Sequence, residues 1–394
     1  MPKPHTPDPT TVLERVMRGP LEQPIRRSGR VGMILLIGIV GFVAGLSGGL
    51  VAISFLLPTP SVIDGITLRR NRNASSVTPA LPALAPITAS VVDLFAVDGK
   101  AETPALLPLA SRTGRGVALT SDGWVVTVRS SLPLRPTIRP VAVTADRKIR
   151  RIDRIAFDPI SDLAFVHIPD LQAAVLPLRS RTGMSIGATL FAPTPDGGLI
   201  PLTLRTIVAR DTMGTVRSSD RWGSTIALHA PSDTPPGTPV VDADGAMVGI
   251  TTDGIHALPI DAVTSALPPL FADGIVSRNV LGITYRDASE FGFSERESTD
   301  GVVIVRDGRV PAIRSTSPLV SRMSEGDVLL AIGDDPLTAR RLLPELLQEY
   351  PIGASVTIRA RHERREVTIE VPLGTVKGEV LVVAEPAAQR RNVE

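Results

Sequence analysis

One uncharged segment constrains the fold of this chain more than any other part of its sequence. No charged residue occurs between Arg30 and Asp64, and Val31 to Leu57 is continuously apolar. A run of this length crosses a lipid bilayer as a helix with some tilt. Leu56-Leu57-Pro58 lacks the small residues of a signal-peptide cleavage site, so a retained helix is favoured over a cleaved signal peptide. We therefore predict a transmembrane helix at 31–57 that contacts the lipid bilayer.

The flanking sequences predict how this helix is oriented. Four arginines precede it, namely Arg18, Arg26, Arg27 and Arg30. Because positive charge favours the cytoplasmic side, we place the N-terminus in the cytoplasm and residues 58–394 outside it, in a periplasm or at the cell exterior. Residues 1–30 are polar and contain prolines, which predicts a disordered cytoplasmic segment. Residues 58–86 are rich in Pro, Ala, Ser and Thr and predict a linker.

The composition excludes several classes of function. There is no cysteine, so disulfides and thiol nucleophiles are absent. The five histidines do not have the spacing of a metal site, and we predict neither a metal nor another cofactor. With 42 basic and 40 acidic residues, the chain has no overall basic field that would favour nucleic acid as a partner.

The sequence of residues 87–270 predicts an all-β domain. Short runs of Val, Ile and Leu alternate with turns rich in Gly, Pro and Asp, and the first strand is predicted around Ser90 to Val97. The strongest hairpin signal lies near the end of this region. Val240 and Val241 lead into Asp242-Ala-Asp-Gly245, and an apolar strand resumes at Met247.

Four motifs of this domain occur in an informative order. They are Gly114–Thr127, Asp158-Pro-Ile-Ser-Asp162-Leu-Ala, Thr234–Ile250 and Gly254–Val263. In this order they resemble the segments of HtrA (Deg) proteases that carry the catalytic histidine, the aspartate, the serine and the closing strand. The resemblance implies a chymotrypsin-like domain of two β-barrels. It also implies a serine endopeptidase that acts outside the cytoplasm.

The same resemblance places unusual residues at two of the three catalytic positions. Asp162 matches the acid, but Ser130 stands at the histidine and Pro236 at the serine. A serine hydroxyl is not a general base near neutral pH. Proline has neither the hydroxyl of a nucleophile nor the N–H that a nucleophile contributes to an oxyanion hole. For Asp162 without its usual partner, we expect a carboxylate satisfied by local hydrogen bonds.

Residues 271–375 resemble an HtrA-type PDZ domain, which has an α+β fold. The motifs that carry this resemblance are Glu325-Gly-Asp-Val-Leu and Ile332-Gly-Asp. The resemblance makes Leu281-Gly282-Ile283 the loop that receives a peptide's terminal carboxylate, with the strand from Ile283 to Tyr285 pairing with the peptide. A helix from Ala339 to Tyr350 would line the groove. Its groove residues would be Leu342 and Leu346, and Arg286 is a candidate to hold the carboxylate. The alternative is a PDZ fold that only packs against its neighbour. We assign no function to the tail, residues 376–394.

Three functions fit this arrangement. The favoured one is a pseudoprotease, anchored in the cytoplasmic membrane, that binds peptides or protein C-termini and regulates or scaffolds envelope proteins or proteolysis. The second is an active endopeptidase with displaced residues, for which Ser232 with His229, or His167, are the candidates. The third is a passive envelope scaffold. Because HtrA relatives often form trimers, a homo-oligomer is a candidate partner arrangement.

Overall fold

The computed structural model of this protein describes residues 83–98, 106–135, 137–207, 215–230, 234–291, 300–338, 341–362 and 365–383. All of them belong to one compact unit, Ser76–Glu394. The predicted cytoplasmic segment 1–30 and membrane helix 31–57 lie outside the described residues. Within the described ranges, no helix has the length and apolar character that a membrane span requires. Helix α2 (Leu84–Ser90) begins inside the predicted linker 58–86.

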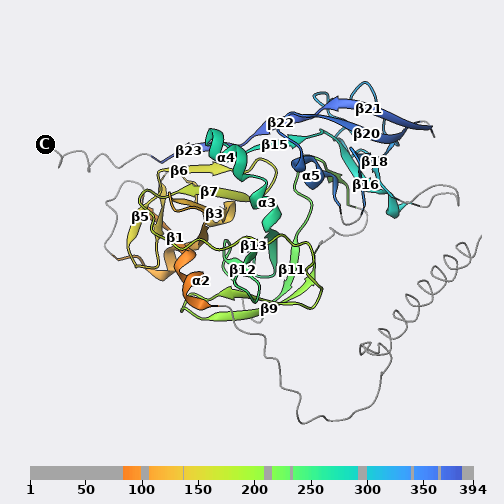
Figure 1. Ribbon diagram of the computed structural model, residues 1–394. Helices are drawn as coiled ribbons and strands as arrows, with labels where there is room; N and C mark the ends of the chain where they lie inside the picture. The colour runs from red at the N-terminus through yellow and green to blue at the C-terminus, as the bar shows by residue number, and fades with distance from the viewer. Residues whose placement is uncertain are drawn as a thin grey trace, which may run out of the picture. The chain divides into compact units, whose positions relative to one another are not determined.

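An eight-stranded sheet forms the first half of the protease-like region (Figure 1). Its strand order is β23-β6-β7-β3-β2-β1-β4-β5. The strands are β1 (Val91–Asp98), β2 (Arg112–Ala118), β3 (Trp124–Val128), β4 (Ile138–Val143), β5 (Ile149–Arg151), β6 (Arg154–Phe157), β7 (Leu163–His167) and β23 (Val380–Val382). The short 3-10 helices η2 (Leu109–Ser111) and η3 (Arg129–Ser131) precede β2 and follow β3.

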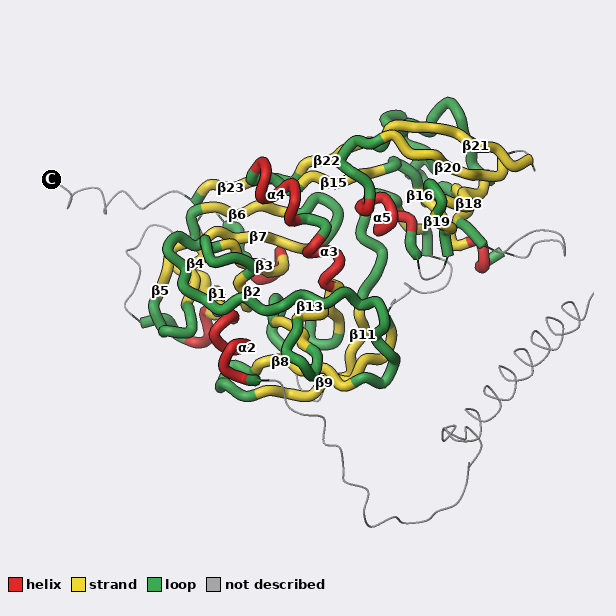
Figure 2. Tube along the Cα trace, viewed as in Figure 1, coloured by secondary structure: helices red, strands yellow, loops and turns green. Residues whose placement is uncertain are grey.

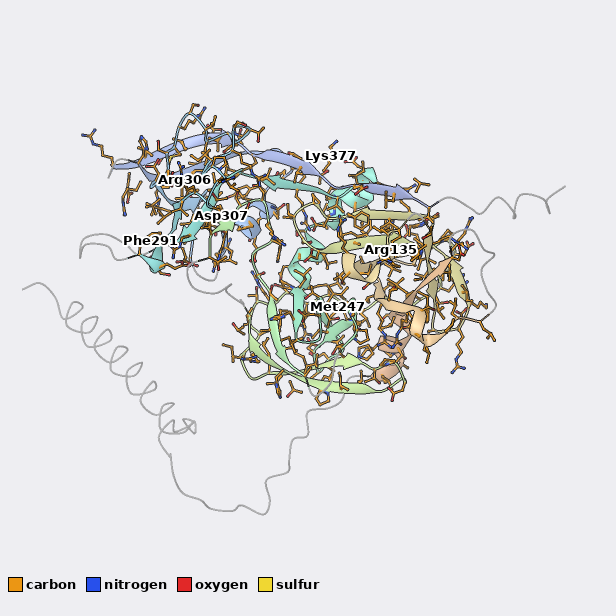
Figure 3. The ribbon with its side chains drawn as sticks, turned by 180° about the vertical axis from the view of Figure 1, so that it is seen from behind. Arg135, Met247, Phe291, Arg306, Asp307 and Lys377 are labelled. Carbon is orange, nitrogen blue, oxygen red and sulfur yellow. The ribbon has the colours of Figure 1, made fainter. Side chains whose placement is uncertain are left out.

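The second half is a closed barrel in the order β11-β14-β13-β12-β8-β9. Its strands are β8 (Thr189–Pro193), β9 (Leu199–Thr206), β11 (Ile226–His229), β12 (Pro239–Val241), β13 (Met247–Thr251) and β14 (His256–Pro259). Val240 pairs with Gly249, and Gly245 turns with a φ of 83°, so the predicted hairpin is confirmed. Met247 at the start of β13 is fully buried (Figure 3).

Of the two predicted barrels, only the second is closed among the described residues. In the first half, β23 bonds to β6 at the edge where a closing strand would pair, with Leu381 opposite Ile155. The C-terminal strand therefore leaves the first half as an open sheet. The two halves share one apolar core, because alternate residues of β3 point to opposite faces. Val126 and Val128 enter the shared cluster, whereas Val125 packs inside the first half.

A third β-region follows two short helices, α3 (Ile260–Thr264) and α4 (Leu267–Asp273). Its strands run in the order β10-β16-β17-β18-β20-β21, and β19 pairs with β18 (Figure 2). They are β10 (Arg217–Ser218), β16 (Thr284–Asp287), β17 (Val302–Ile304), β18 (Val328–Ile332), β19 (Asp335–Pro336), β20 (Ser355–His362) and β21 (Arg365–Pro372). The 3-10 helix η4 (Ala288–Glu290) follows β16. Strand β10 belongs in sequence to the connection between β9 and β11, yet it is an edge strand of this sheet.

The predicted helix 339–350 is much shorter than expected. Helix α5 spans Leu343–Leu346 and continues only as the 3-10 turn η5 (Leu347–Glu349). Leu342 is extended, with φ −79° and ψ 143°. Pro344 explains the difference, because proline is tolerated in the first turn of a helix and disrupts its interior.

The predicted tail at 376–394 contains ordered strands. Strand β22 (Gly374–Lys377) crosses the predicted boundary and pairs with β15 (Ser277–Val280), so that Lys377 lies opposite Ser277 (Figure 3). Strand β23 then joins the first sheet beside β6. Gly378 permits this passage, since a Cβ there would lie 1.8 Å from the carbonyl oxygen of Phe157.

Candidate functional site

The three segments that carry the protease-like positions lie together. Ser130 lies in η3, directly after β3, and Asp162 directly precedes β7. The Arg129 N–H donates to the Asp162 carbonyl oxygen at 2.7 Å. The Pro236 carbonyl accepts from the Arg115 N–H at 2.9 Å and from the Ser131 hydroxyl at 3.2 Å. Strand pairing and these bonds thus bring the loop of Pro236 against the end of β3.

The loop from Thr234 to Thr238 is held by its own carbonyl groups. The Pro235 carbonyl accepts from the Thr238 and Thr251 hydroxyls, both at 2.7 Å. Gly237 has a φ of 80°, and a Cβ there would lie 1.9 Å from the Arg115 carbonyl oxygen. Only glycine fits this approach. The loop is therefore a rigid structural connection between the two halves.

The groups at this site do not form a nucleophile and base. Pro236 has no hydroxyl and no N–H, so both the attacking atom and one oxyanion donor are missing. Ser130 is exposed, and the adjacent Ser131 is buried with its hydroxyl bonded to Pro236. The expectation that local hydrogen bonds satisfy the Asp162 carboxylate stays a prediction. Asp162 is exposed, and its side chain has no bonding partner among the described residues. The buried, bonded carboxylate of this motif is that of Asp158.

The described histidines lie elsewhere. His167 Nδ1 is 2.8 Å from Asp153 Oδ1, and its Nε2 is 3.0 Å from the Asp122 carbonyl oxygen. His167 ends β7, five residues of strand or about 16 Å from Asp162. His229 is exposed at the end of β11, and Ser232 lies outside the described residues.

The two remaining described histidines are also occupied. Nδ1 of His256 is 2.9 Å from Asp253, and Nδ1 of His362 is 2.7 Å from Asp327. Within the described ranges, no histidine contacts Ser130 or Asp162. No group of three His, Asp or Glu residues is placed there to hold a metal ion.

Asp158 has a structural role that its motif alone does not reveal. Arg278 of β15 donates to both of its oxygens, Nε at 3.1 Å and Nη2 at 2.5 Å, and both side chains are fully buried. Nη1 of the same guanidinium donates to Ser265, and Nη2 to the Ala262 carbonyl, both at 2.7 Å. The Ile160 N–H and the Ser161 hydroxyl also bond to Asp158. This bidentate pair fastens β15 to the first sheet and to α3.

The predicted carboxylate-binding loop holds a carboxylate of the same chain. The N–H groups of Leu281 and Gly282 donate to Oδ1 of Asp220 at 3.2 and 2.8 Å. The Ile283 N–H donates to the Ser219 hydroxyl at 3.0 Å. Gly282 has a φ of 72°, which aims consecutive N–H groups at one point, as in other anion-binding loops of backbone amides. The loop therefore binds a carboxylate in this structure.

The segment that carries this carboxylate adds a strand to the sheet. Strand β10 pairs antiparallel with β16, with Arg217 opposite Tyr285. The Ser219 N–H then donates to the Ile283 carbonyl at 2.9 Å. The other carboxylate oxygen of Asp220 lies 3.0 Å from Nη1 of Arg314.

Arg286 does not hold the carboxylate, contrary to the prediction. Its Nε lies 3.1 Å from Glu290, and its guanidinium stacks 5.1 Å above the Phe291 ring. Arg314, rather than Arg286, supplies the charge at the loop. Asp220, Ser219 and Arg314 were not predicted. The stretch Arg217-Ser-Ser-Asp has the composition of an ordinary polar connection, and no local pattern shows that it reaches a loop sixty residues later.

The predicted groove side chains are mostly core residues. Tyr285 and Leu346 belong to the core of the third β-region, with Leu281 and Ile283, and all are essentially unexposed. Leu342 is also buried. Burial raises the pKa of the Tyr285 hydroxyl, which has no hydrogen-bond partner among the described residues. The loop's backbone, and not these side chains, contacts the carboxylate of Asp220.

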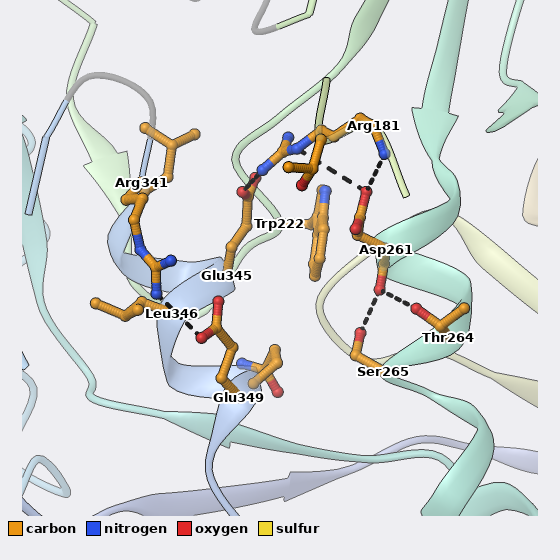
Figure 4. Close-up of a pocket in the computed structure, with 12 residues that line it drawn as sticks. Arg181, Trp222, Asp261, Thr264, Ser265, Arg341, Glu345, Leu346 and Glu349 are labelled. Carbon is orange, nitrogen blue, oxygen red and sulfur yellow. Dashed lines mark hydrogen bonds and ion pairs between the residues drawn. The ribbon is translucent and has the colours of Figure 1, made fainter. Parts of the chain in front are cut away.

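A cavity of about 400 Å³ lies beside α5 (Figure 4). Trp222, two residues after Asp220, forms part of its wall, with Leu342 and Leu346 also lining it. Arg181 contacts Glu345 across the cavity. Burial raises the pKa of Glu345, although the charge of Arg181 acts in the opposite direction. The charged groups here are paired with one another and do not form a nucleophile and base.

Comparisons with known proteins agree with this fold. A family model described as a trypsin-like peptidase domain matches residues 114–250. A probable periplasmic serine endoprotease DegP-like of Pseudomonas fluorescens is 24% identical over 288 residues, which cover 68% of this chain and 58% of that protein. The serine protease Do-like HtrA of Lactococcus lactis is 23% identical over 252 residues, 56% of this chain and 60% of that protein. The chain thus spans less than two thirds of the length of these relatives.

Solved structures give the same result for the fold. The HtrA-type protease AlgW with a decapeptide has a TM-score of 0.55 and 17% identity, and the match covers 74% of this chain and 97% of that one. The S227A form of AlgW with a decapeptide has a TM-score of 0.54. Residues 114–250 thus match a trypsin-like peptidase domain, and the similarity to DegP-like and HtrA proteins supports an HtrA/Deg-type serine protease family member.

Proposed function

We propose that this protein is a non-catalytic HtrA/Deg-type protein whose third β-region is a PDZ domain that binds peptides with a free C-terminal carboxylate. One observation carries the proposal: the N–H groups of Leu281 and Gly282 converge on a carboxylate oxygen. An edge strand beside β16 accompanies that carboxylate, which is how extended peptides bind by strand addition. The structures of AlgW were solved with a decapeptide, which favours a peptide as the class of ligand.

The absence of catalysis rests on the loop of Pro236. Its carbonyl groups are bonded to Arg115, Ser131, Thr238 and Thr251, so the loop acts as a structural connection. The curated relatives are named serine endoproteases, which favours an active enzyme as the second candidate. That candidate would need a serine and a base at positions other than 236 and 130.

A cellular setting follows from the relatives and from the sequence. The DegP-like relatives are described as periplasmic, which supports a location outside the cytoplasm for residues 58–394. We propose that 31–57 anchors the chain in the cytoplasmic membrane. In this setting the protein would regulate or scaffold envelope proteins or proteolysis.

The test of catalysis uses the full chain with unfolded casein and a fluorophosphonate probe. Ser130→Ala, Ser232→Ala and His229→Ala variants are the matched samples. We expect neither cleavage nor labelling. Labelling that one of these variants abolishes would identify displaced catalytic residues and contradict the proposal.

The test of binding uses a library of random peptides with free C-termini and the same library with amidated C-termini. We expect the full chain to retain only peptides with a free carboxylate. Equal retention of both libraries, or of neither, would favour a passive scaffold.

A further inference from the structure

We propose that residues 217–220 are a built-in ligand of the carboxylate-binding loop, so that a peptide binds only by displacing them. This inference rests on the proposed peptide-binding function and adds its regulation. The segment reproduces the two parts of a bound peptide end. Its backbone extends the sheet beside β16, and a carboxylate follows directly in the loop.

The position of that carboxylate is specific. The Ser219 N–H donates to the Ile283 carbonyl at 2.9 Å, and the Asp220 carboxylate then accepts from Leu281 and Gly282. If a peptide ended at the position of Ser219, its terminal carboxylate would lie close to the place that the Asp220 side chain now fills. The aspartate therefore acts in place of a chain terminus.

The segment occupies the loop's N–H groups and buries most of the bound carboxylate. Ser219 is fully buried, and the Asp220 side chain is 12% exposed. Arg314 neutralises the second carboxylate oxygen. After Asp220, Trp222 lines the cavity beside α5, and Gly223 packs on Leu342. Because the amides and the arginine are already occupied, a free peptide must displace Asp220 before it can bind.

The segment is also attached weakly enough to leave. Strand β10 has only two residues, and it is an edge strand that no other strand covers among the described ones. It lies in the connection between β9 and β11 and contributes no strand to the closed barrel. Its release would leave the barrel's own hydrogen bonds intact.

The ligand class follows from what the segment places there. Ser219 is buried at the position of a last residue, so the site favours a small terminal side chain followed by a free carboxylate. An attached ligand competes at a high effective concentration. The apparent Kd of a free peptide is therefore its intrinsic Kd divided by the fraction of molecules in which the site is open.

The test uses the full chain and Asp220→Asn, which removes the charge and keeps the shape. Ser219→Pro, which removes the N–H bonded to Ile283, is an independent second variant. Asp273→Asn, an exposed carboxylate on α4, is the matched control. The probe is the fluorescein-labelled peptide Met-Gly-Thr-Val-Arg-Ser-Ser, the sequence of residues 213–219, with a free or an amidated C-terminus.

Two quantities are measured, the amide hydrogen exchange of residues 281–283 and the Kd of the peptide by fluorescence anisotropy. Because hydrogen bonds to charged groups are the strong ones, we expect exchange to rise at least about tenfold in both variants and Kd to fall at least about tenfold. The amidated peptide should not bind, and Asp273→Asn should behave as the unmodified chain does.

The outcomes separate the inference from the function on which it rests. Unchanged exchange at 281–283 in both variants, or the same peptide Kd in variants and unmodified chain, would overturn the built-in ligand. Exchange that rises while no protein binds the peptide would leave the closure of the loop supported and contradict peptide binding at this site.

Discussion

At the scale of single residues, the most consequential position is Pro236. Its carbonyl group is bonded to Arg115 and Ser131. Proline has neither a hydroxyl nor a backbone N–H, the two groups that acyl transfer uses at a nucleophile position. These bonds hold the loop in one conformation, which supports the proposed structural role. Asp162 remains exposed beside it without a described partner.

We expect Pro236→Ser to remain inactive, because a serine hydroxyl without a neighbouring base is a weak nucleophile. Ser130→His combined with Pro236→Ser restores the three residue types at positions that the structure brings together. We expect only the double variant to react with a fluorophosphonate probe, measured by gel fluorescence. Labelling of the single variant would show that a base other than residue 130 serves this site.

The buried pair of Arg278 and Asp158 yields a prediction about stability. Removing one partner of a buried ion pair leaves an uncompensated charge, which costs about 3–5 kcal/mol. We expect Arg278→Ala to lower the free energy of unfolding by that amount in urea. Arg309→Ala, an exposed arginine, should change it little.

Replacing both members of the pair provides the internal control. The double variant Arg278→Met with Asp158→Leu has no unpaired charge, so it should be less destabilised than Arg278→Ala. Equal destabilisation would show that packing of the arginine, and not charge, dominates at this position.

At the scale of elements, the sequence predicts which segments form strands better than it predicts where an element ends or which strands pair. The hairpins β2–β3 and β12–β13 follow from alternating apolar residues and from turn residues that tolerate positive φ. Such signals are local, so a sequence pattern can detect them. The leucine spacing at 339–350 predicts a longer helix than the chain forms, because Pro344 confines the helix start to Leu343.

Contacts between distant segments could not be predicted in this way. Arg278 lies 120 residues from Asp158, and Asp220 lies about 60 residues from the loop that binds it. Each is a common polar residue in an unremarkable local sequence. Only the folded backbone brings them together, and the resemblance to a family gave no reason to examine either position.

Helix α5 carries a prediction about pH. Burial raises the pKa of Glu345 above its ordinary value of 4.5, so the folded state holds the proton more tightly than the unfolded state. The stability from this group is present below about pH 4.5 and is lost as the pH rises through the folded pKa.

We therefore expect Glu345→Gln to flatten the dependence of the free energy of unfolding on pH above about pH 4.5, where the stability contributed by the protonated carboxyl is lost. The comparison is one of slopes in urea titrations. Glu349→Gln, an exposed neighbour, should keep the slope of the unmodified chain. A slope that Glu345→Gln leaves unchanged would mean that the charge of Arg181 cancels the effect of burial on this pKa.

At the scale of the whole molecule, the three β-regions are joined by more than the covalent chain. Strand β10 of the barrel connection lies in the third sheet, and β23, after the third sheet, lies in the first. The pair of Arg278 and Asp158 adds a buried contact between them. These shared elements predict that the described unit unfolds as one.

Trp124 lies in the core that the two halves share and Trp222 lines the cavity beside α5, whereas far-UV circular dichroism reports all three sheets. We expect tryptophan fluorescence and circular dichroism to give the same midpoint in thermal unfolding. Two separate midpoints would show that the third β-region unfolds by itself.

The pairing of β15 with β22 has a consequence for how such a chain can be rearranged. The strands that lead into and out of the third β-region are neighbours, with Ser277 opposite Lys377. The third β-region is therefore arranged like a domain insertion, because the chain enters and leaves it at neighbouring strands. We expect any replacement module to need ends that lie equally close together, so that β23 still returns to the edge of the first sheet.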